Sequence, residues 1–186
     1  MGSKAEEVLR KIERRRGWRG FPIIGPEKGR VLVDLIRRDK PKHILEVGTL
    51  VGYSAIMMGK ELESAAEIVT IEIDEDMAKI AKKNIALAEL KAKVEVLVGD
   101  ALKVIPMLDK EFDLVFLDAS KDEYFDYLKL VEDKIHRGTI VVADNAGFSA
   151  GMMSNYLDYV RNSGKYESQF ISFGWDGMEV SRRGLY

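Results

Sequence analysis

Residues 44–54 read ILEVGTLVGYS, an apolar run that contains one carboxylate and passes at once into a glycine-containing turn. Two further stretches resemble it: DLVFLDASK at 113–121 and TIVVADN at 139–145. Short runs of Val, Ile and Leu with few polar interruptions are typical of parallel strands that are covered on both faces. Open α/β sheets bind their ligands beyond the carboxyl ends of such strands. The polar residues around these ends are therefore the first candidates for a functional site.

Short apolar runs alternate with segments of helical length through most of the chain. Strands are expected at 43–48, 68–73, 94–99, 113–118 and 139–144. Helices are expected between them, at 53–62, 75–88, 101–108, 121–134 and 151–163. This alternation predicts an α/β fold with a mostly parallel sheet and helices on both of its faces.

The two ends of the chain depart from this alternation. Near the C-terminus, strand candidates at 167–173 and 177–183 are joined by a short turn that contains glycine. We expect them to finish a seven-stranded sheet as an antiparallel hairpin. Before the first strand, helical segments are expected at 4–16 and 27–38.

Length and composition narrow the class of protein. The 186 residues contain no long linker, so we expect a single domain over 1–186, with 1–38 as N-terminal helical segments. A formal net charge of -2 gives no global case for binding nucleic acid or a membrane. No apolar stretch is long enough to span a bilayer, so a soluble, cytoplasmic protein is expected. The absence of cysteine excludes disulfides, thiolate metal sites and cysteine nucleophiles.

Gly48 and Gly52 lie in the turn after the first strand, where dinucleotide-binding enzymes also place glycines. The third glycine of GxGxxG is absent, and Glu46 stands where its charge would oppose a bound diphosphate. That carboxylate instead favours a cofactor with an amino group and a sulfonium, so S-adenosylmethionine fits better than NAD. A turn that binds no ligand is the alternative for this segment taken alone.

Acidic residues at the ends of the next two strands extend this candidate cofactor site. Glu72 lies 24 residues after Gly48 and is placed to accept hydrogen bonds from both hydroxyls of a ribose. Asp100 is placed either to accept the adenine amino group or to cap the next helix, and the sequence leaves that choice open. For Asp74 we expect the simpler role of a helix N-cap.

Asp118, Asp144 and Asn145 end two further strands and offer oxygen ligands without a Cys or His among them. This is the donor chemistry of Mg²⁺ or a similar hard cation. Lys121 lies one helical turn beyond Asp118, so its amine is placed to take or stabilise a proton at the same point. The alternatives are a helix cap, a turn and a solvated lysine.

The chain resembles the metal-dependent class I O-methyltransferases, the group of catechol and caffeoyl-CoA O-methyltransferases, from about Ile24 to Arg183. The motifs that carry the resemblance are, in order, GPEKGRVL, LEVGTLVGYSA, VTIEID, FLDASK, ADN and DGMEVSRR. The resemblance implies the Rossmann-like class I methyltransferase fold. It implies S-adenosylmethionine contacts from Gly48, Ser54, Glu72 and Asp100, with Ile24 near the methionine part. It also implies Asp118, Asp144 and Asn145 as Mg²⁺ ligands and Lys121 as the catalytic base.

The acceptor side departs from the catechol enzymes, in which a further glutamate near the C-terminal strands binds the second hydroxyl. SFGWDGMEV contains no clear counterpart, although Asp176 lies nearby. Phe148 and Trp175 are candidate substrate walls, with the core as the alternative location. The chain has no long insertion to hold a carrier such as coenzyme A. We therefore expect a methyl group to be transferred to a small, catechol-like or phenolic hydroxyl substrate in a compact pocket.

Two other functions remain open. The first is methylation of transfer RNA, because relatives of this group methylate a hydroxylated uridine there. The second is a non-enzymatic regulator that binds the cofactor but has lost a working active site. The intact Asp, Lys and Asp-Asn set argues against the regulator. A basic cluster could track RNA phosphates, but a solvated amphipathic helix explains it better. The cluster consists of Arg10, Lys11, Arg14, Arg15, Arg16 and Arg19. Apolar residues among these charges, Val8, Leu9, Ile12 and Trp18, are expected to pack either within the chain or across a homodimer.

Overall fold

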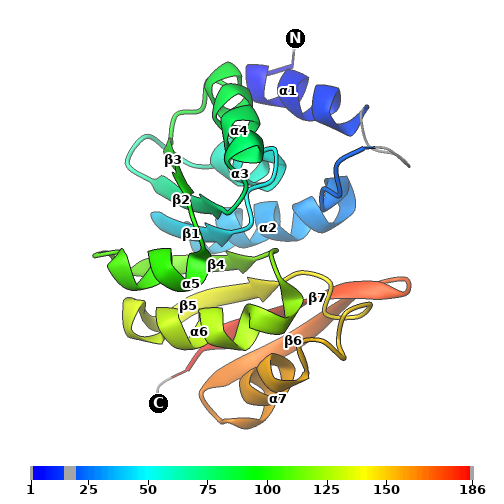
Figure 1. Ribbon diagram of the computed structural model, residues 1–186, viewed down its shortest axis with the longest axis vertical. Coiled ribbons are helices and arrows are strands. Elements are labelled where there is room, and N and C mark those ends of the chain that lie inside the picture. The colour runs from blue at the N-terminus through cyan, green and yellow to red at the C-terminus, as the bar shows by residue number, and fades with distance from the viewer. Residues whose placement is uncertain (1, 15–19, 185–186) are drawn as a thin grey trace.

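The computed structural model describes residues 2–14 and 20–184, and its strands form one seven-stranded sheet in the order β3-β2-β1-β4-β5-β7-β6 (Figure 1). The strands are β1 (His43–Val47), β2 (Glu67–Glu72), β3 (Lys93–Val98), β4 (Phe112–Leu117), β5 (Ile135–Ala143), β6 (Tyr166–Phe173) and β7 (Asp176–Arg183). β1 to β5 pair in parallel, whereas β7 is antiparallel to both β5 and β6. The predicted mostly parallel sheet with an antiparallel C-terminal hairpin is confirmed.

Helices cover both faces of the sheet (Figure 1). They are α1 (Lys4–Glu13), α2 (Gly25–Asp39), α3 (Tyr53–Gly59), α4 (Glu75–Leu87), α5 (Ala101–Val104), α6 (Tyr124–Val131) and α7 (Ser154–Asn162). Alternate residues of each central strand point to opposite faces. In β4, Leu114 and Phe116 join the core formed with α1, α2 and α3, whereas Val115 and Leu117 join the core formed with α5, α6 and α7. This explains why the strands are apolar at nearly every position.

Several element boundaries differ from those expected. β5 begins at Ile135 rather than at 139. The start of β5 still pairs with β4, because the register shifts between Phe112 and Leu114 and Gly138 adopts a positive φ of 92°. The segment expected to be one helix at 121–134 is α-helical only in α6, with a 3₁₀ turn at each end. Short 3₁₀ turns are common at helix ends because they satisfy otherwise unpaired backbone groups. α7 starts three residues later than expected, after a series of turns.

The apolar stripe of α1 is buried within the chain itself. Val8, Leu9 and Ile12 join the core that includes α2 and α3, so this stripe needs no second subunit to cover it. Trp18, the fourth residue of the expected stripe, lies outside the described residues, as do Arg15, Arg16 and Arg19 of the basic cluster. Within residues 2–14 and 20–184, no helix is both long and apolar enough to cross a membrane.

Candidate active site

The register of the parallel strands brings the predicted residues to one edge of the sheet. Val47 in β1 lies between Ile71 in β2 and Leu117 in β4. The residues that follow these three are therefore neighbours, and the amide of Asp118 donates to the carbonyl of Val47 at 2.8 Å. Leu117 is paired in turn with Ala143, which places the next two residues, Asp118 and Asp144, side by side.

Gly48 is required by the close approach of two of these strand ends. Its φ is +99°, and a Cβ at this position would lie 2.3 Å from the carbonyl oxygen of Asp118. Any larger residue would push the turn after β1 away from the turn after β4. Gly52, with a φ of +83°, begins α3 in the left-handed region that glycine adopts at least cost. The two glycines therefore shape the turn.

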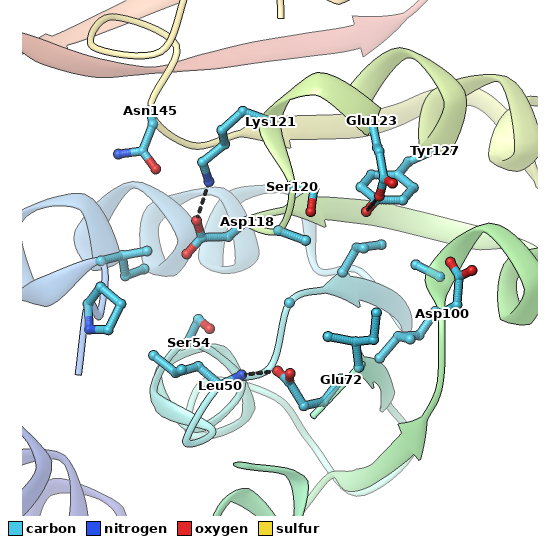
Figure 2. Close-up of a pocket in the computed structure, with 18 of the residues that line it drawn as sticks. Leu50, Ser54, Glu72, Asp100, Asp118, Ser120, Lys121, Glu123, Tyr127 and Asn145 are labelled. Atoms are coloured by element: carbon cyan, nitrogen blue, oxygen red, sulfur yellow. Dashed lines mark hydrogen bonds and ion pairs between the residues drawn. The ribbon is translucent and has the colours of Figure 1, made fainter. Parts of the chain in front are cut away.

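A cavity of about 520 Å³ lies beyond the ends of β1, β2 and β4 (Figure 2). The predicted cofactor residues Ile24, Gly48, Ser54, Glu72 and Asp100 all line it. Sequence reasoning missed other lining residues, because nothing in the local pattern distinguishes them from ordinary helix and loop residues. They include Leu50, Ile73, Ser120, Glu123 and Tyr127.

Backbone amides hold the carboxylate of Glu72 at the cavity wall. Its Oε2 accepts a hydrogen bond from the amide of Leu50 at 2.6 Å, and its Oε1 accepts one from the amide of Asp74 at 3.0 Å. Asp100 has one of the two roles left open by the sequence, the helix cap, and its contact with adenine stays a prediction. It accepts a hydrogen bond from the amide of Leu102 as the N-cap of α5, and it also lines the cavity. Asp74 caps α4 as predicted.

Glu46 lies behind the cavity wall instead of lining it. Its carboxyl group is fully buried and accepts hydrogen bonds from the hydroxyl groups of Ser54 and of Thr70, the latter at 2.5 Å. The hydroxyl of Thr70 is in turn 2.6 Å from that of Thr49 in the glycine turn. Burial raises the pKa of Glu46 to about 8, against the opposing effect of the two hydroxyl donors. In the structure, Glu46 therefore bonds to Ser54 and does not face the cavity. This position does not support the direct cofactor contact that we expected for Glu46.

A second cavity, of about 580 Å³, adjoins the first and contains the three predicted metal ligands. Asp118, Asp144 and Asn145 line it together, and Asp118 and Asn145 also line the first cavity. Apolar side chains from two ends of the chain form another part of its wall. They are Pro22, Ile23, Ile24, Pro26, Phe173 and Trp175. Glu27, Lys28 and Asp176 complete the lining. Asp118 and Asp144 form what we call the acidic floor of this cavity, and the apolar residues form its apolar wall.

Lys121 points to the acidic floor, as predicted. Its Nζ donates to Oδ1 of Asp118 at 2.8 Å (Figure 2). It also donates to the hydroxyl of Tyr124 at 2.7 Å. The Tyr124 hydroxyl donates to the carbonyl of Leu117, which fixes it at the end of β4. Burial raises the pKa of Asp118, and the neighbouring Asp144 acts in the same direction, whereas Lys121 opposes both. Lys121 is thus held where sequence reasoning placed the base.

Asp144 faces a second lysine that sequence reasoning missed. Nζ of Lys28 lies 2.6 Å from Oδ1 of Asp144 and 2.5 Å from Oδ2 of Asp176. Burial alone would lower the pKa of Lys28, but its bonds to the two carboxylates outweigh burial and raise it, so the group is an ammonium. No local signal identifies Lys28, because its contact with Asp176 spans 148 residues of sequence.

The donor set fits a hard cation. Asp144 is almost fully buried, and the ammonium of Lys28, 2.6 Å from its Oδ1, balances its charge. A hard cation held by Asp118, Asp144 and Asn145 would share that carboxylate with Lys28 or displace it. Within the described residues, no group of three or more His, Cys, Asp or Glu side chains is arranged for a metal. The candidate site consists of two carboxylates and the amide of Asn145.

The two aromatic candidates lie at the surface. Trp175 is 77% exposed and Phe148 is 69% exposed, and their rings meet edge to face with centroids 4.9 Å apart. The alternative interpretation, in which these two side chains belong to the core, is therefore wrong. Trp175 lines the second cavity, as expected for a substrate wall.

Known proteins resemble this chain in sequence over most of its length. Residues 3–163 match the O-methyltransferase family. Catechol O-methyltransferase of Bos taurus is 34% identical over 158 residues, which are 81% of this chain and 57% of the bovine protein. Catechol O-methyltransferase B of Danio rerio is 38% identical over 155 residues, which are 80% of this chain and 58% of that protein. The chain thus spans less than two thirds of the length of these relatives.

Solved structures resemble the fold over nearly the whole chain. An O-methyltransferase from Bacillus cereus in complex with SAH has a TM-score of 0.85 at 25% identity, and the match covers 98% of this chain and 91% of that one. The O-methyltransferase involved in tomaymycin synthesis in Streptomyces achromogenes, in complex with SAM, has a TM-score of 0.86 at 24% identity and covers 99% and 91%. The sheet order, the family match and the sequence relatives agree. The chain has the Rossmann-like class I methyltransferase fold and belongs to the O-methyltransferase family.

Proposed function

We propose that this protein transfers a methyl group from S-adenosylmethionine to a hydroxyl of a small phenolic or catechol-like substrate, with the help of a divalent cation. One observation carries the proposal: two cavities adjoin at Asp118 and Asn145, and one has the features of a cofactor site while the other has an acidic floor under an apolar wall. Methyl transfer needs such adjoining sites, because the acceptor oxygen must lie in line with the S-methyl group.

The first cavity has groups for each part of S-adenosylmethionine. Glu72 presents its carboxylate to the cavity, with both oxygens oriented by backbone amides, and is placed to accept hydrogen bonds from the ribose hydroxyls. Asp100 lines the cavity and would accept a hydrogen bond from the adenine amino group, and the exposed side chain of Ile73 would offer an apolar surface to the base. Ser54 and Gly48 line the wall of the glycine turn, where the methionine part would lie. The similarity to proteins solved with SAM and SAH supports this cofactor.

The second cavity suits the acceptor. Asp118, Asp144 and Asn145 would hold Mg²⁺ or a similar ion, which when bound favours the ionised form of a hydroxyl and fixes its position. The amine of Lys121, close to Asp118 and Tyr124, would stabilise or remove the hydroxyl proton. Trp175 and Phe173 provide an apolar wall for an aromatic ring and help to exclude water. The similarity to catechol O-methyltransferases supports a phenolic substrate.

Calorimetry tests the cofactor half of the proposal. S-adenosylmethionine should bind in the presence of a chelator, because none of the proposed cofactor contacts depends on metal. Glu72→Ala removes the acceptor for two ribose hydroxyls and should weaken binding by about 1 to 3 kcal/mol. Asp74→Ala is the matched control, because it removes a carboxylate from the next turn that caps α4 and does not line the cavity. Equal losses for the two variants, or binding of NAD instead, would contradict the assignment.

A transfer assay tests the acceptor half. Methyl transfer from radiolabelled S-adenosylmethionine should be measured with a pool of catechols and phenols and, separately, with unmodified and hydroxylated transfer RNA. We expect labelled small molecules, loss of labelling in excess chelator, and recovery with Mg²⁺. Asp144→Ala should abolish the metal-dependent transfer while cofactor affinity persists. Labelling of RNA alone would replace the proposed substrate, and undiminished transfer in chelator would exclude the metal.

A further inference from the structure

Asp176, at the start of β7, accepts hydrogen bonds from three separate parts of the chain. Its Oδ2 accepts from Nζ of Lys28 at 2.5 Å and from Nδ2 of Asn145 at 2.8 Å, and its Oδ1 accepts from the amide of Phe148 at 3.0 Å. An ammonium and a backbone N–H can only donate, so both oxygens of Asp176 face donors and Asp176 acts as the acceptor.

This property determines which way the amide of Asn145 faces. A side-chain amide has an oxygen and a nitrogen of similar shape, and its orientation follows from its partners. Because Asp176 only accepts, Asn145 must turn Nδ2 to it, and Oδ1 then faces the other way. In Figure 2 the oxygen of Asn145 lies on the side of Lys121 and Asp118, and the nitrogen lies on the far side. A hard cation binds an amide through its oxygen.

We propose that Asp176 is a positioning residue for the cation site: it holds the Asn145 amide with Oδ1 toward the site. The proposal rests on the proposed function, because it assigns a role in binding the same cation. Rigid presentation matters here because Asn145 has a positive φ of 58° in a turn, and its side chain has no other described hydrogen bond to orient it. Partners that orient a ligand in this way typically change metal affinity by 10- to 100-fold.

Lys28 offers a second route by which Asp176 could affect a cation. The ammonium of Lys28 is shared between Asp144 and Asp176, and without Asp176 it would pair with Asp144 alone. A full positive charge on Asp144 would compete with a cation for that carboxylate. Both routes predict weaker cation binding when Asp176 is removed, so a single variant cannot separate them.

A double-mutant cycle between residues 176 and 145 separates the two routes. Mn²⁺ is titrated into the whole protein, and free Mn²⁺ is measured by electron paramagnetic resonance, which requires neither substrate nor turnover. We expect Asp176→Ala to weaken Mn²⁺ binding about tenfold in the otherwise unchanged protein. In an Asn145→Ala background the same change should cost less than about twofold, because no amide remains to be positioned.

Three outcomes would overturn the inference. Unchanged Mn²⁺ affinity in Asp176→Ala would exclude any positioning role. Equal losses with and without Asn145 would show that Asp176 acts through Lys28. If Mn²⁺ does not bind to the unchanged protein, both the cation in the proposed function and this inference are wrong. If Mn²⁺ does bind to the unchanged protein, either of the first two outcomes contradicts this inference and leaves the proposed function standing.

Two controls show whether a variant has lost Mn²⁺ affinity only because it is misfolded: its affinity for S-adenosylmethionine and a second substitution of Asp176. Affinity for S-adenosylmethionine should not change on Asp176→Ala in either background, because Asp176 does not line the cofactor cavity. Asn145 does line that cavity, so each background is compared only with itself. If Asp176→Ala does not fold, Asp176→Leu replaces it, because leucine has a similar shape and accepts no hydrogen bond. Mn²⁺ binding should then weaken at least threefold, and unchanged affinity would contradict the inference.

Discussion

Replacing Glu46 by Gln should change how the stability of the protein depends on pH. In the folded protein, Glu46 is fully buried with hydroxyl partners, and burial raises its pKa to about 8. In the unfolded chain the same carboxyl group titrates at about 4.3. Between these two values the folded state retains a proton that the unfolded state has lost. The free energy of unfolding must therefore fall as pH rises through this window.

The size of the effect follows from the two pKa values. Each unit of difference corresponds to about 1.4 kcal/mol, so Glu46 alone should lower the free energy of unfolding by about 4 to 5 kcal/mol between about pH 4.5 and pH 8. Gln has the shape of the protonated acid and does not ionise. The Glu46→Gln variant should thus be about as stable as the original protein near pH 5 and more stable by a few kcal/mol at pH 8.

Urea denaturation of the two proteins at half-unit intervals from pH 5 to pH 8.5 measures the difference. The comparison cancels contributions from other groups with shifted pKa values, such as Asp113 and Glu132, which both proteins share. Parallel curves would refute the argument, because they would mean that folding does not oppose the ionisation of Glu46. Glu46→Gln could instead weaken S-adenosylmethionine binding tenfold without altering the pH dependence of stability. In that case Glu46 would contact the charged cofactor directly, and its hydrogen bond with Ser54 would not be its main role.

Lys121→Ala should lower the maximal rate of transfer by about 10²- to 10⁴-fold while leaving Mn²⁺ bound, because Lys121 is assigned to the proton and not to the cation; loss of Mn²⁺ binding would contradict this. Trp175→Ala should raise KM for an aromatic acceptor with little change in unfolding free energy, within about 0.5 kcal/mol, because the side chain is largely exposed. A large fall in stability would show that Trp175 is structural. Gly48→Ala should weaken S-adenosylmethionine binding strongly, since its Cβ would meet the Asp118 carbonyl at 2.3 Å, and equal binding by calorimetry would refute that contact.

The positions of Glu72 and Asp118 illustrate what a pattern of local residues can predict. A strand buried on both faces must be apolar at nearly every position, so the polar residue that ends it is conspicuous in the sequence. Parallel strands then place these ends at one edge, whatever the details of the helices. For this reason the cofactor and metal candidates could be selected, and all but Glu46 line the two cavities. Their roles in binding and catalysis, the single domain and the cytoplasmic location remain predictions.

Lys28 and Asp176 illustrate what local patterns cannot predict. They meet only because the first turn of α2 and the start of β7 come together beside Asp144, which follows β5. Which lysine faces a buried carboxylate depends on that packing. Glu46 is a subtler case, because the sequence placed it at the correct strand but could not tell which side chains surround it.

By itself, then, the sequence determined the alternation of strands and helices, the sheet edge that carries the site and most of its residues, because apolar periodicity and strand ends are properties of neighbouring residues. Only the tertiary structure decided the direction in which Glu46 points and the joining of Lys28, Asp144 and Asp176 into one charged group. Those contacts join residues far apart in the chain, and side-chain burial and hydrogen bonding exist only once the elements have packed.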